Sequence, residues 1–151
     1  FVAYTIPNHG PLPPKVGQET TYTVVWSVIN AFNDISNTQV RATLPSYVKW
    51  LGKIYPENEK LNYNSDTGEI IWTIGALSAG QGYANPPKEV SFQIGLTPSV
   101  SQLGRTPVLL TKSTLTADDV FTENKLESSR NELTTHATEP GFRFGDETVT
   151  Q

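Results

Sequence analysis

The chain has 151 residues, 36% of them hydrophobic, and a formal net charge of −4 from 11 basic and 15 acidic residues. It contains no Cys, which excludes disulfides, a cysteine nucleophile and thiolate metal sites. It also contains no Met, which favours a processed product or a segment of a longer chain. The acidic balance argues against a nucleic-acid partner, and no apolar run approaches the roughly 20 residues that a membrane helix needs. The 19 Thr and 11 Ser favour β structure and suit an exported protein.

Apolar and polar residues alternate along the chain with the period of two that marks half-buried strands. The clearest case is the segment 90–97, and Asp66-Thr67-Gly68 is typical of a hairpin turn with glycine at a positive φ. The number and spacing of such segments predict an all-β fold, an antiparallel β-sandwich of about seven to nine strands. It would form one domain over residues 1–140, with a C-terminal extension or linker at 141–151. The expected strands are 20–28, 39–44, 48–51, 61–63, 69–74, 90–97, 108–116 and 133–138.

The segment 117–133 is the one stretch in which a helix competes with a strand, because 108–139 contains neither Gly nor Pro. A helix packed on the core needs apolar residues at spacings of three and four. After Val120 and Phe121, polar residues such as Asn124 and Ser128 occupy those positions. The pattern therefore argues against a packed helix and leaves a short helical turn open.

Three tryptophans, Trp26, Trp50 and Trp72, fall on the apolar faces of expected strands. A platform that stacks on sugar rings is the alternative, but residues in phase with the apolar face are core residues first. Each indole can bury about 200 Å². We therefore expect the three to stabilise the sandwich in place of the absent disulfide.

Short motifs follow one another in a recognisable order between positions 14 and 97. A Thr21-Tyr22-Thr23-Val24 strand leads to an Asn-containing turn at 30–33. The second motif is Leu44-Pro45 followed by the apolar Val48. The most specific motif is Trp72-Thr73-Ile74-Gly75-Ala76-Leu77-Ser78-Ala79-Gly80. Together they resemble the immunoglobulin-like "conserved repeat" domains of large prokaryotic cell-surface proteins. The resemblance implies an immunoglobulin-like β-sandwich, an extracellular or cell-surface location, a stalk, spacer or adhesive role, and no catalytic residues. The section after Pro98 exceeds the usual repeat, which leaves room for extra strands or a specialised surface.

Few residues are placed for catalysis. Both histidines lie in a turn or on the solvent side of a strand, where they do not suit a Ser-His-Asp or metal site. Neighbouring carboxylates on a strand point to opposite faces and do not converge naturally. We therefore expect that the protein is not an enzyme. The groups considered are His9, His136, Glu57, Glu59, Asp118 and Asp119.

Calcium and a covalent cross-link are weaker alternatives. Asn62, Asn64 and Asp66 alternate before Gly68, but an EF-hand needs Gly at position 67 and Glu at position 73, where this chain has Thr. A hairpin explains these residues better, so we expect no cofactor. A second possible calcium site combines Asp118 and Asp119 with a loop carboxylate such as Asp34. An isopeptide bond would join Lys15 to Asn124 or Asn131, but no local pattern buries Lys15.

The first functional hypothesis is a non-catalytic structural or spacer module of a larger cell-surface or extracellular protein. It would contact neighbouring domains of the same chain or copies of the same protein. The apolar-rich segment 1–6, and Phe142 with Phe144, are candidates for a strand shared between subunits. The alternative is an adhesive module that binds a glycan or a protein through loop aromatics. Its candidate ligand contacts are Tyr55, Tyr63, Tyr83 and Asn85; clustering on one face would favour binding, and scatter would favour the spacer.

Overall fold

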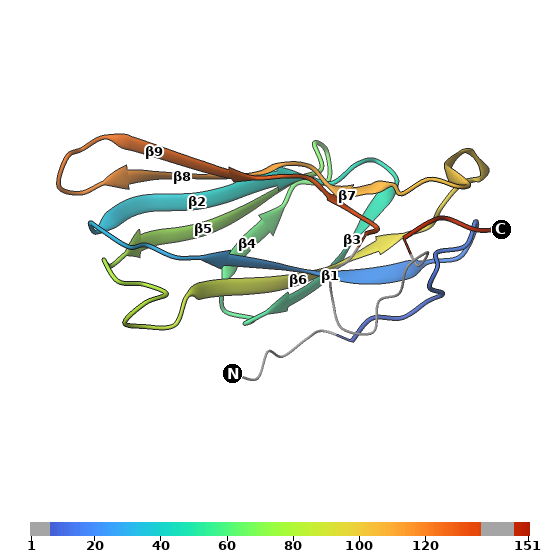
Figure 1. The fold of residues 1–151 in the computed structure, drawn as a ribbon, viewed down its shortest axis with the longest axis horizontal. Coiled ribbons are helices and arrows are strands. Elements are labelled where there is room, and N and C mark those ends of the chain that lie inside the picture. Colours follow the sequence, from blue (N-terminus) through green and yellow to red (C-terminus); the bar gives the residue numbers. More distant parts are fainter. Residues whose placement is uncertain (1–6, 137–146) are drawn as a thin grey trace.

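Two β-sheets face each other across an apolar core (Figure 1). The structure is a computed structural model that describes residues 7–136 and 147–151. These residues form ten strands and one short 3-10 helix. The strands are β1 (Thr20–Val28), β2 (Ile35–Thr43), β3 (Val48–Tyr55), β4 (Lys60–Tyr63), β5 (Glu69–Leu77), β6 (Lys88–Leu96), β7 (Val108–Leu110), β8 (Ser113–Asp119), β9 (Lys125–Arg130) and β10 (Leu133–Thr134), and the helix is η1 (Val100–Gln102).

The smaller main sheet has the strand order β1-β6-β3, and the larger has the order β4-β5-β2-β8-β9. β7 and β10 pair in a two-stranded ribbon, and every ladder between these strands is antiparallel. β6 is the central strand of the smaller sheet, and seven of its nine residues are buried. The expected all-β fold, an antiparallel immunoglobulin-like sandwich, is confirmed.

The tryptophans join the two sheets, as the alternation predicts. Trp26 of β1 stacks on Trp72 of β5 with ring centroids 6.3 Å apart, and it meets Phe92 of β6 edge-on at 5.0 Å. Trp72 is fully buried, and Trp26 is 7% exposed. Trp50 of β3 is half-buried and stacks on Tyr63 of β4 with centroids 5.4 Å apart. The core therefore rests on aromatic packing between facing strands, which buries large apolar areas.

The expected strand at 108–116 is wrong as a single element, because the chain changes partners within it. β7 ends at Leu110 and pairs with β10, whereas β8 begins at Ser113 and pairs with β2 and β9. Between them, the Thr111 N–H donates to the Thr43 carbonyl at 3.0 Å, and the Thr43 N–H donates to Thr111 Oγ1 at 2.8 Å. The apolar alternation runs on through this change of partner, which is why the pattern does not mark it.

The segment 117–133 forms a β-hairpin of β8 and β9 rather than a helical turn. Every residue of β9 is exposed, so its pairing comes from the backbone and leaves no apolar pattern to detect. With this strand, the described residues contain ten strands, where the sequence predicted about seven to nine. The expected strand at 133–138 is shorter, since β10 ends at Thr134 and positions 137 and 138 lie outside the described residues.

The described C-terminal residues pack on the sandwich. Val149 is 2% exposed, and Thr150 forms a parallel bridge with Lys15 ahead of β1. The domain boundary at 140 and 141 stays a prediction, and the segment 1–6, Phe142 and Phe144 lie outside the described residues. In the ranges that the structure describes, no helix is long and apolar enough to cross a membrane.

Candidate functional site

The four candidate ligand contacts do not share one kind of position. Tyr55 is the last residue of β3 and is 42% exposed, and Tyr63 is the last residue of β4, stacked on Trp50. Both are therefore strand residues, whereas the binding hypothesis treats them as loop residues. For Tyr63, the expected strand at 61–63 agrees with the structure. Tyr83, 66% exposed, and Asn85 do lie in a loop, where the Asn85 carbonyl accepts the Gly82 N–H at 2.8 Å.

The length of β5 separates the tyrosines on β4 and on the 78–87 loop. Tyr63 pairs with Ile70 near the start of β5, and Tyr83 follows after β5 ends at Leu77. At about 3.3 Å per residue, the strand from Ile70 to Leu77 spans about 23 Å. Tyr63 therefore lies far from Tyr83 and Asn85, and this separation argues against one glycan platform built from all four residues.

Glu59, one of the acidic residues considered for catalysis, supports the core. Its Oε1 accepts the Trp72 indole N–H at 2.9 Å, and its Oε2 pairs with Lys88 Nζ at 2.9 Å. The Glu59 side chain is 11% exposed, whereas Glu57 is exposed. The two carboxylates therefore have different surroundings and do not form a catalytic pair.

Asp118 and Asp119 organise the β8–β9 hairpin. Asp119 Oδ1 accepts the N–H groups of Phe121 and Thr122, each at 2.9 Å. Those bonds, with the Thr122 backbone N–H foremost, hold the pKa of Asp119 below its ordinary value. Asp118 pairs with Lys125 Nζ at 2.7 Å, and this hydrogen bond is the main reason that the pKa of Asp118 is also lowered. Both side chains have structural partners on the hairpin.

Asp34 has a partner in the protein, and the cross-link candidates Lys15 and Asn124 lie apart. Asp34 Oδ1 accepts the Ala79 N–H at 2.8 Å. Lys15 is exposed and pairs with Thr150 near the C-terminus, while Asn124 lies in the β8–β9 turn at the opposite end of the molecule (Figure 1). Within the described residues there is no group of three or more His, Asp or Glu side chains that could hold a metal ion.

A backbone clamp joins the segment ahead of β1 to the C-terminal residues. The Val16 N–H donates to the Thr150 carbonyl at 2.9 Å, and the Thr150 N–H donates to the Pro14 carbonyl at 2.7 Å. On the other side, Val149 exchanges two backbone hydrogen bonds of 3.0 Å with Gly104 and Arg105. In Figure 1 the red C-terminal segment lies beside the blue segment that precedes β1. We name these contacts of 14–16 and 104–105 with 149–150 the terminal clamp.

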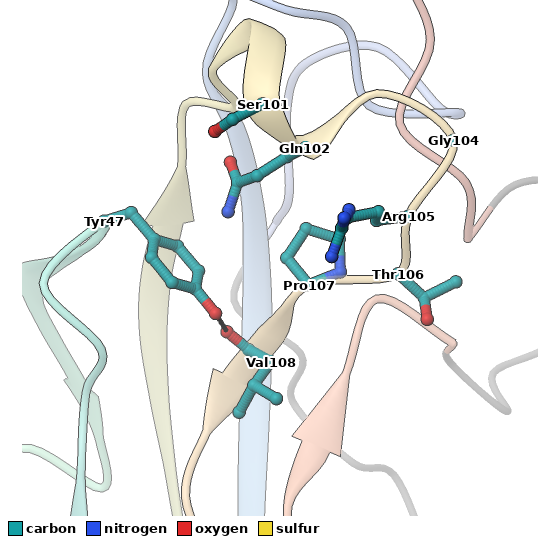
Figure 2. Close-up of a pocket in the computed structure, with 8 residues that line it drawn as sticks. All are labelled: Tyr47, Ser101, Gln102, Gly104, Arg105, Thr106, Pro107 and Val108. Atoms are coloured by element: carbon teal, nitrogen blue, oxygen red, sulfur yellow. Dashed lines mark hydrogen bonds between the residues drawn. The ribbon is translucent and has the colours of Figure 1, made fainter.

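An open pocket of about 750 Å³ lies at the same end of the molecule (Figure 2). Tyr47 faces the 101–107 loop across it, and the Tyr47 hydroxyl donates to the Val108 carbonyl at 2.7 Å. Burial is the main cause that raises the pKa of Tyr47. None of the lining residues is a carboxylate, histidine or cysteine. The lining residues are Tyr47, Ser101, Gln102, Gly104, Arg105, Thr106, Pro107 and Val108.

The sequence predicts that this end of the molecule is unusual but does not identify its contacts. The section after Pro98 stands out as longer than the usual repeat, and it supplies η1, the pocket loop and one side of the terminal clamp. No motif marks Arg105 or Val149, because their role depends on which distant backbone lies beside them. The terminal clamp becomes visible only with the topology.

The fold and the terminal clamp together define an immunoglobulin-like β-sandwich whose described terminal segments lie side by side. Solved structures that it resembles include pilins. BcpA, the major pilin subunit of Bacillus cereus, aligns with a TM-score of 0.50 at 11% identity over 82% of this chain and 36% of that one. Two structures of the major pilin SpaD from Corynebacterium diphtheriae align with TM-scores of 0.46 at 11% identity.

The SpaD alignments cover 80% of this chain, and 47% of a two-domain SpaD fragment or 31% of full-length SpaD. The chain therefore spans less than half the length of the pilin structures that it resembles. The likeness to BcpA, at 11% identity, shows a shared fold. No family model and no curated protein matches the chain.

Proposed function

We propose that this chain is a non-catalytic structural module of a cell-surface protein, a spacer that fixes the distance between its neighbours and contacts adjacent domains or copies of itself. The terminal clamp is the observation that carries the proposal. The fold shared with BcpA, a major pilin subunit, supports a place in a surface assembly. The separation of Tyr63 from Tyr83 and the structural partners of Glu59, Asp118 and Asp119 favour this role over a ligand-binding or catalytic one.

The terminal clamp suits a module that is pulled from both sides. Lys15 and Thr150 belong to parallel segments, one ahead of β1 and one among the last described residues. A force applied between neighbouring modules pulls two such parallel segments in opposite directions along a common axis. The backbone hydrogen bonds between 14–16 and 150 then resist together in shear, instead of breaking one after another.

Single-molecule force spectroscopy on tandem copies of the full chain tests this role. Thr150→Pro removes the N–H that donates to Pro14, and Gln151→Pro is the matched control because no hydrogen bond of the terminal clamp uses the N–H of Gln151. We expect Thr150→Pro to lower the unfolding force clearly and Gln151→Pro to leave it near that of the unmodified chain. Equal unfolding forces for all three chains would contradict a spacer held by the terminal clamp.

A further inference from the structure

One margin of the sandwich is open. β1 is the edge of the smaller sheet and β9 is the edge of the larger, and a groove of about 470 Å³ lies between them. Three apolar side chains on its walls are strongly exposed: Val25 at 51%, Ile29 at 55% and Leu133 at 42%. Trp26, Val28 and Leu115 extend the apolar lining. We name this feature the β1–β9 groove.

Among the four edge strands of the two main sheets, β1 lacks the usual protection against pairing with another chain. Edge strands are commonly protected by charged side chains, by irregularities in register or by being short. β9 carries Lys125, Glu127 and Arg130, β4 has four residues, and β3 carries two lysines and a shift of register after Trp50. β1 has nine residues with neither charge nor proline, and it pairs without a shift along β6. The start of this edge is occupied by the same chain, because the Thr21 N–H donates to the His9 carbonyl at 2.8 Å. The part of the edge that is suited to accept a strand is therefore 23–28.

The segment 1–6, Phe-Val-Ala-Tyr-Thr-Ile, has the chemistry of that strand. It is uncharged, and in an added strand, where side chains alternate, Val2, Tyr4 and Ile6 would share one face and Ala3 and Thr5 the other. Six extended residues span about 20 Å, the length of an equal run of β1. An apolar segment of this length matches the apolar part of the groove lining and the uncharged edge of β1. The β9 side of the groove is polar and is lined by Ser128, Ser129 and Arg130.

The attachment of this segment favours donation to another copy. Gln93 lies on β6, the strand next to β1, and its side chain alternates with the core residues Phe92 and Ile94 and so faces outward from the sandwich. Gln93 Nε2 donates to the Pro7 carbonyl at 2.7 Å. The first described residue is thus held over the outer face of the smaller sheet, whereas the β1–β9 groove opens between the sheets.

We propose that the β1–β9 groove receives the segment 1–6 of a second copy of this chain as an added strand paired with β1. Val2, Tyr4 and Ile6 enter the groove, and the new backbone ladder extends the smaller sheet. The proposal rests on the proposed function, because strand donation is a specific way for the module to contact its neighbour.

Cysteine cross-linking tests the pairing directly, since the chain has no cysteine of its own. Copies carrying Ala3→Cys or Thr5→Cys, which cover two registers, are mixed with copies carrying Ser27→Cys on β1 and oxidised mildly. The matched control acceptor is Asn62→Cys, which is exposed on the edge strand β4. We expect at least tenfold more mixed dimer with the Ser27→Cys acceptor than with the Asn62→Cys acceptor. Equal yields would overturn the proposal.

Two further measurements separate the alternatives. A chain that lacks residues 1–6 should lose self-association at least tenfold by light scattering while it keeps its circular dichroism spectrum, and undiminished association would overturn strand donation. A double variant with Ala3→Cys and Ser27→Cys that closes within one chain at high dilution would show that the segment fills its own groove, which would also overturn the proposal. The unfolding force of tandem copies reports the spacer role separately, so either idea can fail while the other stands.

Discussion

The two margins of the sandwich differ in how the space between the sheets is closed. At the β3–β4 margin, Trp50 stacks on Tyr63, and Glu59 holds both the Trp72 indole and Lys88. At the β1–β9 margin, apolar side chains line a groove that remains open between two edge strands. The sandwich therefore closes one margin with its own side chains and leaves an uncharged edge at the other. Under the strand-donation proposal, the closed margin maintains the fold and the open one receives the donated strand.

The largest effect should come from Trp72→Ala in the core beside the closed margin. The substitution removes a fully buried indole together with its stacking on Trp26 and its hydrogen bond to Glu59. A truncation of this kind lowers the free energy of unfolding by about 3–5 kcal/mol. Urea denaturation measures the loss, with Phe121→Ala at an 84% exposed position as the control. A similar loss in both variants would contradict the assignment of Trp72 to the core.

Glu59→Ala should have an intermediate effect, because it leaves the Trp72 indole N–H and Lys88 Nζ without these partners. An orphaned buried donor lowers stability by about 1–3 kcal/mol. The exposed Glu57→Ala is the matched control, with an expected change within about 0.5 kcal/mol. Equal shifts of the denaturant midpoint in the two variants would contradict a role of Glu59 in closing this margin.

Val25→Lys should change stability little and association strongly. Val25 is 51% exposed, so its substitution should alter the free energy of unfolding by no more than about 0.5 kcal/mol. The lysine gives β1 the kind of charge that protects the other edges. We expect self-association measured by light scattering to fall at least tenfold, while Asn62→Lys on β4 leaves it unchanged. A clear loss of unfolding free energy with unchanged association would contradict the assignment of Val25 to a contact edge.

The smallest effect should be the pH dependence that comes from the β8–β9 hairpin. Hydrogen bonds, chiefly from Lys125 to Asp118 and from the Thr122 backbone to Asp119, lower both pKa values below the ordinary 3.8. Because the unfolded chain binds these protons more readily, the stabilisation is present above about pH 4 and declines as the pH falls through the lowered pKa values. Urea midpoints across that range should fall less steeply for Asp119→Asn. An unchanged slope would contradict the role of Asp119.

Strands that bury one face were predictable, because burial leaves a side-chain pattern. Trp26, Trp72 and Phe92 lie in the core as the alternation predicts. β9 was not predictable, because all its residues are exposed and its ladder with β8 is made by backbone groups that every sequence has. The break at 111–112 was missed for a related reason, since the change of partner leaves the local alternation intact.

The contact surfaces depend on topology, which a local pattern does not contain. The segment 1–6 stood out for its apolar residues, but the groove exists because β1 and β9 both lie at sheet edges on the same margin. The terminal clamp likewise needs Val149 beside Gly104 and Arg105, which are more than 40 residues away. Such juxtapositions follow from the strand order rather than from any motif in one segment.

Amide hydrogen exchange of the associated protein tests the central claim, that β1 is an acceptor edge. The account predicts that association raises the protection of the Val25 and Ser27 amides, which alternate with those bonded to β6, at least tenfold. The amides of the opposite edge at 60–63 should stay unchanged. Protection that rises equally at both edges, or only at 60–63, would contradict the account.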